Sequence, residues 1–281
     1  MSERSNPHSL TPQDSPDIRL VTELRANDLL SLIAGEICVL VVKDFAAVSV
    51  CEKLVSFLMS YNKIEKYTHE VYDEEKIKHL YFGVDRIGQP FNSTFRAGEK
   101  DNVKLNYYRN ALRSIRRIRE ACSPQLSPID RLRLELDEIW DEGANIASFE
   151  GKKMFVGIVR VMKAELSAAC EENLHFDALP EHYYPLDGQF AANIFMSVPD
   201  EGGEFETWKV APLSPSSSIP LNGPEWRNAL PNYLCIRPEV GSLIIFNSRR
   251  PHAVRRFTSG LRASLQCFIG YRHKHPLVMW N

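Results

Sequence analysis

The chain has 281 residues, of which 34 are Lys or Arg and 36 are Asp or Glu, so that its formal net charge is −2. Hydrophobic residues make up 44% and charged residues 25%, a composition typical of a globular protein and not of a disordered one. The near balance of charge argues against a nucleic-acid-binding protein and against a polybasic membrane anchor. The longest apolar runs are too short to span a bilayer.

The first 18 residues are polar, contain three prolines and lack the apolar core of a signal peptide, so we expect a disordered tail over 1–18. The six cysteines are scattered through the chain and form no C-x-x-C pair. This pattern is typical of reduced core thiols and predicts a cytoplasmic protein.

The next part of the chain predicts alternating helices and strands. Helical spacing of apolar residues and β-rich runs place them as follows: a helix over 22–33 that Thr22 caps and Gly35 ends, a buried strand over 36–45, a helix over 47–59, and short strands over 66–71 and 79–84.

Residues 101–143 predict helices that are broken at Ser123-Pro124 and Ser127-Pro128. One apolar face consists of Ala111, Ile115, Ile118 and Cys122. Four arginines lie largely on other faces: Arg109, Arg113, Arg116 and Arg117. They either bind an anionic partner, such as a carrier protein or a phosphate, or form a solvated face balanced by the acidic residues further along the chain.

After Gly151 short β-type runs follow one another, separated by Gly, Pro, Ser and Asn. They cover 155–162, 189–198, 205–210, 233–236, 242–247, 253–257 and 263–271, and a surface loop is expected over 212–224. Many short strands with turns between them favour an antiparallel sandwich or barrel. We expect one continuous domain, in which a helical and mixed part (19–150) surrounds a β core (151–281).

His175 and Asp177 are the first candidates for a metal site. In an extended segment residues two apart point to the same side, so this imidazole and carboxylate can bind one ion. His252 follows a predicted strand and can supply a third ligand. Two imidazoles and one carboxylate are typical of non-haem Fe(II) sites. Each motif is weak alone, because an H-x-D triplet occurs by chance and His252 can be an ordinary loop histidine.

Arg262 and Ser264 follow His252 by ten and twelve residues and face the same way on a predicted strand. A guanidinium and a hydroxyl suit a carboxylate, although an arginine on an edge strand is the alternative. The glycines of the sequence Glu201-Gly202-Gly203-Glu204-Phe205 predict a tight turn with no chemistry of its own.

Together these motifs resemble the Fe(II)- and 2-oxoglutarate-dependent oxygenases. The matching stretches are HFD at 175–177, GGEF at 202–205, PEVGSLIIFNSRRPHAV at 238–254 and GLRAS at 260–264, within residues 150–273. The resemblance implies a double-stranded β-helix (jelly roll), with His175, Asp177 and His252 binding Fe(II). It also implies that Arg262 and Ser264 hold 2-oxoglutarate, that O2 is the oxidant, and that no catalytic residue is needed beyond the iron ligands.

The N-terminal part resembles small free-standing enzymes that modify amino acids in natural-product pathways. We therefore expect hydroxylation of an unactivated C–H in a small substrate, an amino acid or its derivative, free or carrier-bound. In the related halogenases Gly or Ala replaces the carboxylate ligand, so Asp177 favours hydroxylation. Desaturation, cyclisation and epoxidation stay open, as does a non-catalytic jelly roll that binds a metal or a sugar. The oligomeric state also stays open.

Several further residues can be interpreted either as part of a functional site or as structural residues. Asn193 either contacts 2-oxoglutarate or the substrate, or is a hydrogen-bonded core amide. His182 with Asp187, and His273 with His275, are weaker candidates for a metal site. The tryptophans Trp208, Trp226 and Trp280 either line a pocket or belong to the core.

Overall fold

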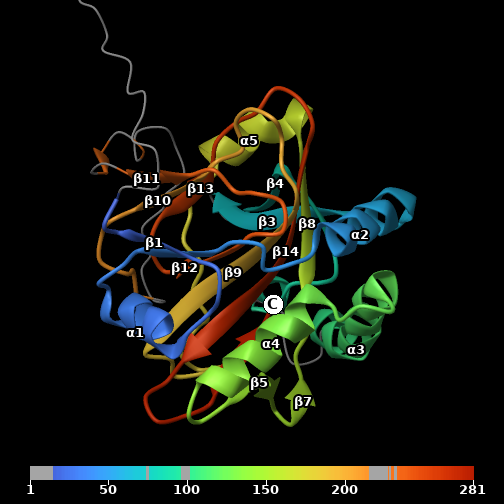
Figure 1. Ribbon diagram of the computed structural model, residues 1–281. Helices are drawn as coiled ribbons and strands as arrows, with labels where there is room; N and C mark the ends of the chain where they lie inside the picture. Colours follow the sequence, from blue (N-terminus) through green and yellow to red (C-terminus); the bar gives the residue numbers. More distant parts are fainter. Residues whose placement is uncertain (1–14, 74–75, 96–101, 215–226, 228, 231–232) are drawn as a thin grey trace, which may run out of the picture.

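The computed structural model describes residues 15–73, 76–95, 102–214, 227, 229–230 and 233–281. Within these ranges the centre is a mixed sheet of ten strands (Figure 1). Its main path runs β1 (Ile18–Val21), β2 (Val39–Val42), β12 (Leu243–Asn247), β9 (Gly188–Ser197), β14 (Leu261–Tyr271), β8 (Ile158–Lys163), β4 (Lys76–Ile87) and β3 (Glu65–Asp73). β15 (Leu277–Trp280) pairs with β14, and β5 (Ala144–Ile146) pairs with β15.

Two smaller sheets accompany the large one. The first has the order β11 (Tyr233–Ile236), β10 (Phe205–Trp208), β13 (His252–Val254), and the second pairs β6 (Ser148–Phe149) with β7 (Lys152–Lys153). The prediction of a mainly β fold with added helices is therefore confirmed. Strands of the N-terminal part, β1 to β4, belong to the same sheet as the C-terminal strands.

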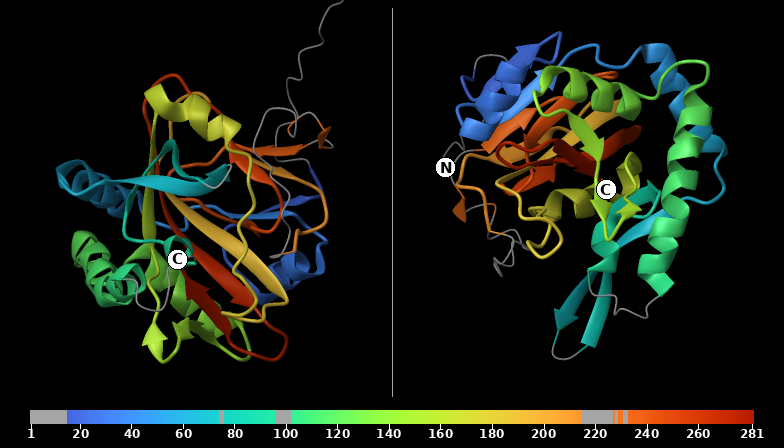
Figure 2. Two further views of the ribbon diagram at one scale, coloured as in Figure 1. Left: turned by 180° about the vertical axis from the view of Figure 1, so that it is seen from behind. Right: turned by 90° about the horizontal axis from the view of Figure 1, so that it is seen from below.

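The helices lie along the outside of the strands (Figure 2). They are α1 (Ala26–Ala34), α2 (Val48–Ser60), α3 (Asn102–Cys122), α4 (Pro128–Ile139) and α5 (Ser167–Glu172), with short 3-10 turns η2 (Phe91–Thr94) and η3 (Ala164–Leu166). α2 packs on β9, α4 on β14, and α1 on β2. β14 is buried along nearly its whole length, so it can place one row of side chains against the helices and the alternate row in the interior.

The predicted helices of the middle region are confirmed. Ala111, Ile115, Ile118 and Cys122 form the buried face of α3. The chain breaks between α3 and α4, where the Ser127 side chain caps α4 and Pro128 occupies its first turn. Arg109, Arg113 and Arg116 are exposed on α3, whereas the Arg117 guanidinium donates to the Tyr61 hydroxyl.

The N-terminal boundaries need two corrections. Ile18 is not part of a tail, because it begins β1, which pairs in parallel with β2. Thr22 does not cap a helix: α1 begins at Ala26 after Arg25, whose side chain makes no capping hydrogen bond. The chain must turn away from β1 before the helix can start, which moves its beginning four residues along. The prediction that Gly35 ends this helix is confirmed, with Gly35 at φ 75°.

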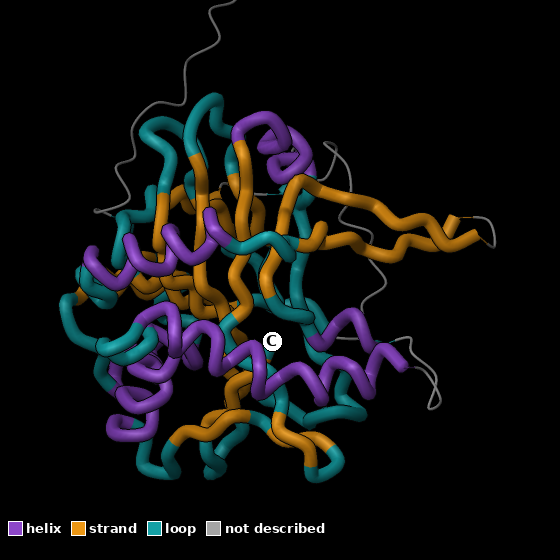
Figure 3. Tube along the Cα trace, turned by 90° about the vertical axis from the view of Figure 1, so that its right-hand side faces the viewer, coloured by secondary structure: helices purple, strands orange, loops and turns teal. Residues whose placement is uncertain are grey.

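The predicted strands agree with the observed strands better in their positions along the chain than in their lengths. β3 and β4 form a hairpin that is longer than the two strands expected and projects from the body (Figure 3). β13 covers only His252–Val254. Most of the loop expected over 212–224 and the tail over 1–14 lie outside the described residues.

The six cysteines are all free thiols, five of them buried, as the sequence predicts. Within the described ranges no helix is long and apolar enough to cross a membrane.

Candidate metal and cosubstrate site

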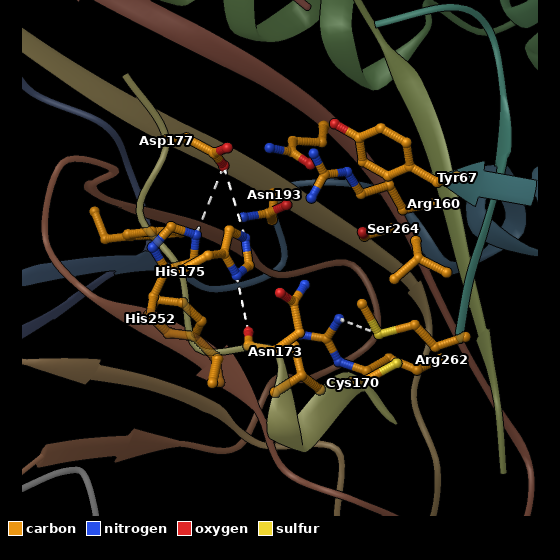
Figure 4. A pocket seen from close by; sticks show the side chains of 17 residues that line it. Tyr67, Arg160, Cys170, Asn173, His175, Asp177, Asn193, His252, Arg262 and Ser264 are labelled. Carbon is orange, nitrogen blue, oxygen red and sulfur yellow. Dashed lines mark hydrogen bonds and ion pairs between the residues drawn. The ribbon is translucent and has the colours of Figure 1, made fainter. Parts of the chain in front are cut away.

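The sheets bring His175, Asp177 and His252 together. His175 lies outside the strands but forms an antiparallel bridge with His252, in which each backbone N–H donates to the other carbonyl at 3.1 and 2.8 Å. Residues directly opposite in such a pair point to the same side, and the two imidazole rings lie 4.4 Å apart. The Asp177 backbone is held by Ser248, and its side chain turns toward both rings (Figure 4).

Hydrogen bonds to the backbone fix which imidazole nitrogen faces the centre of the site. Nδ1 of His175 lies 2.9 Å from the Asn173 carbonyl oxygen, and Nδ1 of His252 lies 2.9 Å from that of Arg250. A carbonyl oxygen only accepts, so each Nδ1 carries the proton and each Nε2 presents its lone pair. This is the arrangement that second-shell hydrogen bonds give to metal-binding histidines.

The three donor atoms fit one divalent ion. One ligand atom from each of the three residues lies within 4.8 Å of the others. Asp177 Oδ2 is buried without a hydrogen-bond partner, 3.9 Å from His175 Nε2 and 3.7 Å from His252 Nε2. These separations are too long for hydrogen bonds, but they are shorter than the roughly 4.2 Å that can separate two donors at about 2.1 Å from one ion. An ion would therefore pair the orphaned oxygen.

Charge at the site favours the ionised carboxylate. Burial raises the pKa of the Asp177 carboxyl, but the His252 and His175 imidazoles in their protonated form and the Arg160 guanidinium outweigh burial and hold this pKa well below its usual range. Phe246 packs edge-on against His252 with ring centroids 4.9 Å apart, and Phe205 lies behind it. The three donors thus lie beside an apolar surface that the rings of Phe246 and Phe205 form.

Arg262 lies in the same cavity as the three donors. It is 6% exposed, its Nε donates to the Gly203 carbonyl at 2.9 Å, and its guanidinium lies over the Phe195 ring at 4.9 Å. Burial lowers the pKa of Arg262 to about 10, so the group stays protonated at neutral pH. Among the described residues no carboxylate forms an ion pair with it. A buried cation without a counterion is costly and calls for an anionic ligand.

Ser264 lines the cavity beside Arg262, as the two-residue spacing predicts, and is 3% exposed. Asn193 lies directly opposite Gln266 across β9 and β14 and also lines the cavity. The other basic residues of the last strands do not reach it: Arg255 pairs with Glu206, and Arg256 and Arg272 are exposed.

Sequence reasoning missed two contributors. Gly203, expected to serve only the turn, accepts the Arg262 Nε–H through its carbonyl, and a side chain there would meet Pro199 at 2.7 Å. Arg160, on β8, also lines the cavity. The sequence does distinguish Arg160, because it is the single charged residue in the apolar run Ile158-Val159-Arg160-Val161-Met162.

A second cavity of about 280 Å³ shares Asn173, His175 and Asp177 with the first, whose volume is about 60 Å³. Its further lining is mostly aromatic and amide: Asn92, Phe95, Phe176, Gln189, Phe268, Trp280 and Asn281. The metal candidates therefore lie between a small cavity that contains Arg262 and a larger one lined mostly by aromatic and amide side chains.

The remaining candidates take no part in the site. His182, His273 and His275 are exposed, and the Asp187 carboxylate accepts from the His273 backbone. Within the described ranges His175, Asp177 and His252 are the one group of three placed to hold a metal. Trp208 is buried in a cluster with Leu174 and Ala253, and Trp226 lies outside the described residues.

No family model and no curated protein matches the chain. Among solved structures it is similar to an N-substituted L-amino acid dioxygenase from Burkholderia ambifaria, at 14% identity and a TM-score of 0.47 over 78% of this chain and 100% of that one. It is also similar to HygX from Streptomyces hygroscopicus with nickel and 2-oxoglutarate bound, at 12% identity and a TM-score of 0.45 over 90% of this chain and 89% of that one. A third is an oxidoreductase of the 2OG-Fe(II) oxygenase family from Burkholderia pseudomallei, at 15% identity and a TM-score of 0.38 over 92% and 97%.

Of these three structures one is thus named as a dioxygenase and one as a member of the 2OG-Fe(II) oxygenase family, and the third has 2-oxoglutarate bound.

Proposed function

We propose that the protein is an Fe(II)- and 2-oxoglutarate-dependent oxygenase that hydroxylates an unactivated C–H of a small substrate, an amino acid or its derivative. One observation carries the proposal. The His175, Asp177 and His252 donors share a cavity with the buried guanidinium of Arg262, which forms no ion pair with a carboxylate of the described residues.

The donor set supports iron. Two imidazoles and one carboxylate on one side of an ion leave the other positions open, as non-haem Fe(II) oxygenases require. When bound, iron and 2-oxoglutarate supply an oxidant that can break an unactivated C–H bond with O2. His175, Asp177 and His252 hold the ion in this proposal, and Arg262 and Ser264 orient the far carboxylate of 2-oxoglutarate. Phe205 and Phe246 limit the access of water.

The carboxylate ligand supports hydroxylation over halogenation, because Asp177 fills the place that a halide would take. Desaturation, cyclisation or epoxidation would follow from a different placement of the substrate over the same centre. A non-catalytic jelly roll that binds a metal or a sugar is less well supported, since it has no need of a buried cation such as Arg262 next to the metal donors. In this proposal the large sheet and the β11-β10-β13 sheet are the two halves of a jelly roll.

The test is succinate formation by the purified protein with Fe(II), 2-oxoglutarate and O2, with and without candidate amino acids. We expect iron-dependent succinate, and its loss in His252→Ala. The matched control is His273→Ala, because His273 is an exposed histidine away from the cluster. Near-wild-type, iron-dependent turnover in His252→Ala would contradict the ligand assignment. Absence of both succinate and 2-oxoglutarate binding in the wild type would contradict the proposed function.

A further inference from the structure

A second buried cation faces the metal candidates. Arg160 of β8 lies directly opposite Ser264 of β14, so that the two side chains point to the same side. Figure 4 shows Arg160 beside the Tyr67 ring and on the side of the pocket where Asp177 lies, whereas Arg262 lies with Cys170 and Asn173. The two guanidinium groups therefore serve different parts of one cavity.

Among the described residues no carboxylate forms an ion pair in direct contact with Arg160, although its charge acts on the Asp177 carboxyl across the cavity. Its guanidinium lies over the Tyr67 ring at 5.1 Å, and its Nε is buried without a hydrogen-bond partner. By contrast Arg86, its neighbour across β4, is paired with Glu65 at 2.9 Å. The Nε of Arg86 is likewise buried without a partner, so the difference between the two arginines is that Arg86 has a carboxylate partner and Arg160 lines the cavity.

Gln266 supplies a second unpaired polar group. It follows Ser264 by two residues on β14, so it faces the same cavity, diagonally across from Arg160. The side chain is 2% exposed, and its Oε1 has no hydrogen-bond partner. A buried amide left unpaired costs free energy, and native structures rarely tolerate one without a ligand or water. Because the unpaired atom is the oxygen, which only accepts, it calls for an N–H or O–H group of a ligand, such as the amino group of an amino acid.

The charge of the cavity shows that 2-oxoglutarate alone is not enough. Arg160, Arg262 and Asp177 are the lining residues with a formal charge when the histidines are neutral. With a divalent ion added, three positive charges remain. The 2-oxoglutarate dianion removes two of them and leaves one without a counterion. A buried uncompensated charge is strongly unfavourable.

We propose that Arg160 binds the carboxylate of the primary substrate and that Gln266 Oε1 accepts a hydrogen bond from an N–H or O–H group of the same molecule. The inference rests on the proposed function and narrows it. The substrate is a small free acid whose remainder extends past the metal into the second cavity. An amino acid joined to a carrier protein through its carboxyl group has no carboxylate for Arg160, so the proposal selects the free acid over the carrier-bound one.

The experiment measures binding without turnover. The protein is loaded with Fe(II) and 2-oxoglutarate under anaerobic conditions and titrated in a calorimeter with the proteinogenic amino acids and with their primary amides. We expect at least one free acid to bind at least about tenfold more tightly than its amide, since a charge-assisted hydrogen bond is lost in the amide. Before the amino acids are added, a separate titration of the Fe(II)-loaded protein with 2-oxoglutarate alone measures cosubstrate binding and so tests the proposed function.

The variants separate Arg160 from Arg262. Arg160→Gln should weaken binding of the acid at least about tenfold and abolish the preference over the amide, while affinity for 2-oxoglutarate changes less than about threefold. Arg160→Lys should be intermediate, because it keeps the charge and loses the fork. Gln266→Leu should lower the affinity for the free acid by a smaller factor, about two to ten. Arg116→Gln, an exposed arginine on α3, is the matched control.

Three results would overturn the proposal while 2-oxoglutarate still binds: no free acid of the panel binds, acid and amide bind equally, or Arg160→Gln keeps the preference for the acid. Loss of 2-oxoglutarate affinity in a folded Arg160→Gln would also overturn it, because Arg160 would then serve the cosubstrate. Failure of the wild type to bind 2-oxoglutarate would overturn both proposals.

Discussion

Truncation of Arg262 is the sharpest test of the cosubstrate site. Its guanidinium is 6% exposed and contacts neutral groups, the Gly203 carbonyl and the Phe195 ring. It is therefore available to form a charged hydrogen bond with a ligand carboxylate. Removing one partner of a buried charged pair costs about 2–5 kcal/mol, much of it from the carboxylate left unpaired. Each 1.4 kcal/mol is about a factor of ten in affinity, so we expect Arg262→Ala to raise the KM for 2-oxoglutarate at least about tenfold.

Arg262→Lys should give an intermediate KM, because lysine keeps the charge and loses the planar fork. The assay is succinate release at saturating primary substrate over a range of 2-oxoglutarate concentrations, with thermal unfolding of each variant as the folding control. At saturating 2-oxoglutarate the kcat should fall less than kcat/KM, since the lost contact is made in the ground state as well. The exposed Arg272 provides the matched control, Arg272→Ala. An unchanged KM in Arg262→Ala would refute the assignment.

Three further predictions follow from single contacts. Asp177→Gly should abolish hydroxylation but keep 2-oxoglutarate binding by calorimetry; robust hydroxylation without an added carboxylate would show that Asp177 is not a ligand. Ser264→Ala should raise the KM for 2-oxoglutarate by only about two- to tenfold, from the loss of one hydrogen bond; a larger rise than in Arg262→Ala would reverse their ranking. Asp130→Asn should destabilise the fold by about 1–3 kcal/mol at neutral pH. Burial raises the Asp130 pKa, but hydrogen bonds from Arg119 and Ser127 outweigh burial and lower it. The stabilisation is therefore present above the unfolded-state pKa of about 3.9 and is lost as the pH falls through the lower folded-state pKa. Chemical denaturation of both proteins across that range should show the difference shrinking in acid; a constant difference would contradict it.

The direction of site residues could be predicted where the local period of an extended chain decides it. Arg262 and Ser264 are two residues apart on β14, His175 and Asp177 are two apart in an extended segment outside the strands, and the structure places both members of each pair in one cavity. Such predictions need no knowledge of which strand pairs with which. The helical face of α3 was predictable for the same reason, because a period of 3.6 is a local property of the chain.

Features that depend on pairing between distant segments could not be predicted. β1 has four residues, and its partner β2 begins 21 residues after the start of β1, so no local pattern separates Ile18 from the tail. The role of Gly203 depends on the approach of Arg262 from a strand almost 60 residues later. Arg160 reaches the site because β8 pairs with β14 with Arg160 opposite Ser264, a register set by tertiary packing.

The unpaired polar groups of the cavity are best understood together. Arg160 Nε, Gln266 Oε1 and Asp177 Oδ2 are all buried without hydrogen-bond partners, and the buried Arg262 has no carboxylate partner among the described residues. Each of these groups costs stability in the free protein, and an apolar side chain of similar size would avoid that cost. Unpaired buried polar atoms also occur elsewhere in the described residues, Arg86 Nε among them, but these four groups are gathered in one cavity, on both sides of the metal candidates. A metal would pair Asp177 Oδ2, and the carboxylates of the dianion and of the substrate would pair Arg262 and Arg160. Gln266 Oε1 needs an N–H or O–H donor from the substrate, because an amide oxygen only accepts. The ligands thus restore stability at the place where the free protein gives it up, so their binding must stabilise the protein by an amount that grows with the logarithm of their concentration over their Kd.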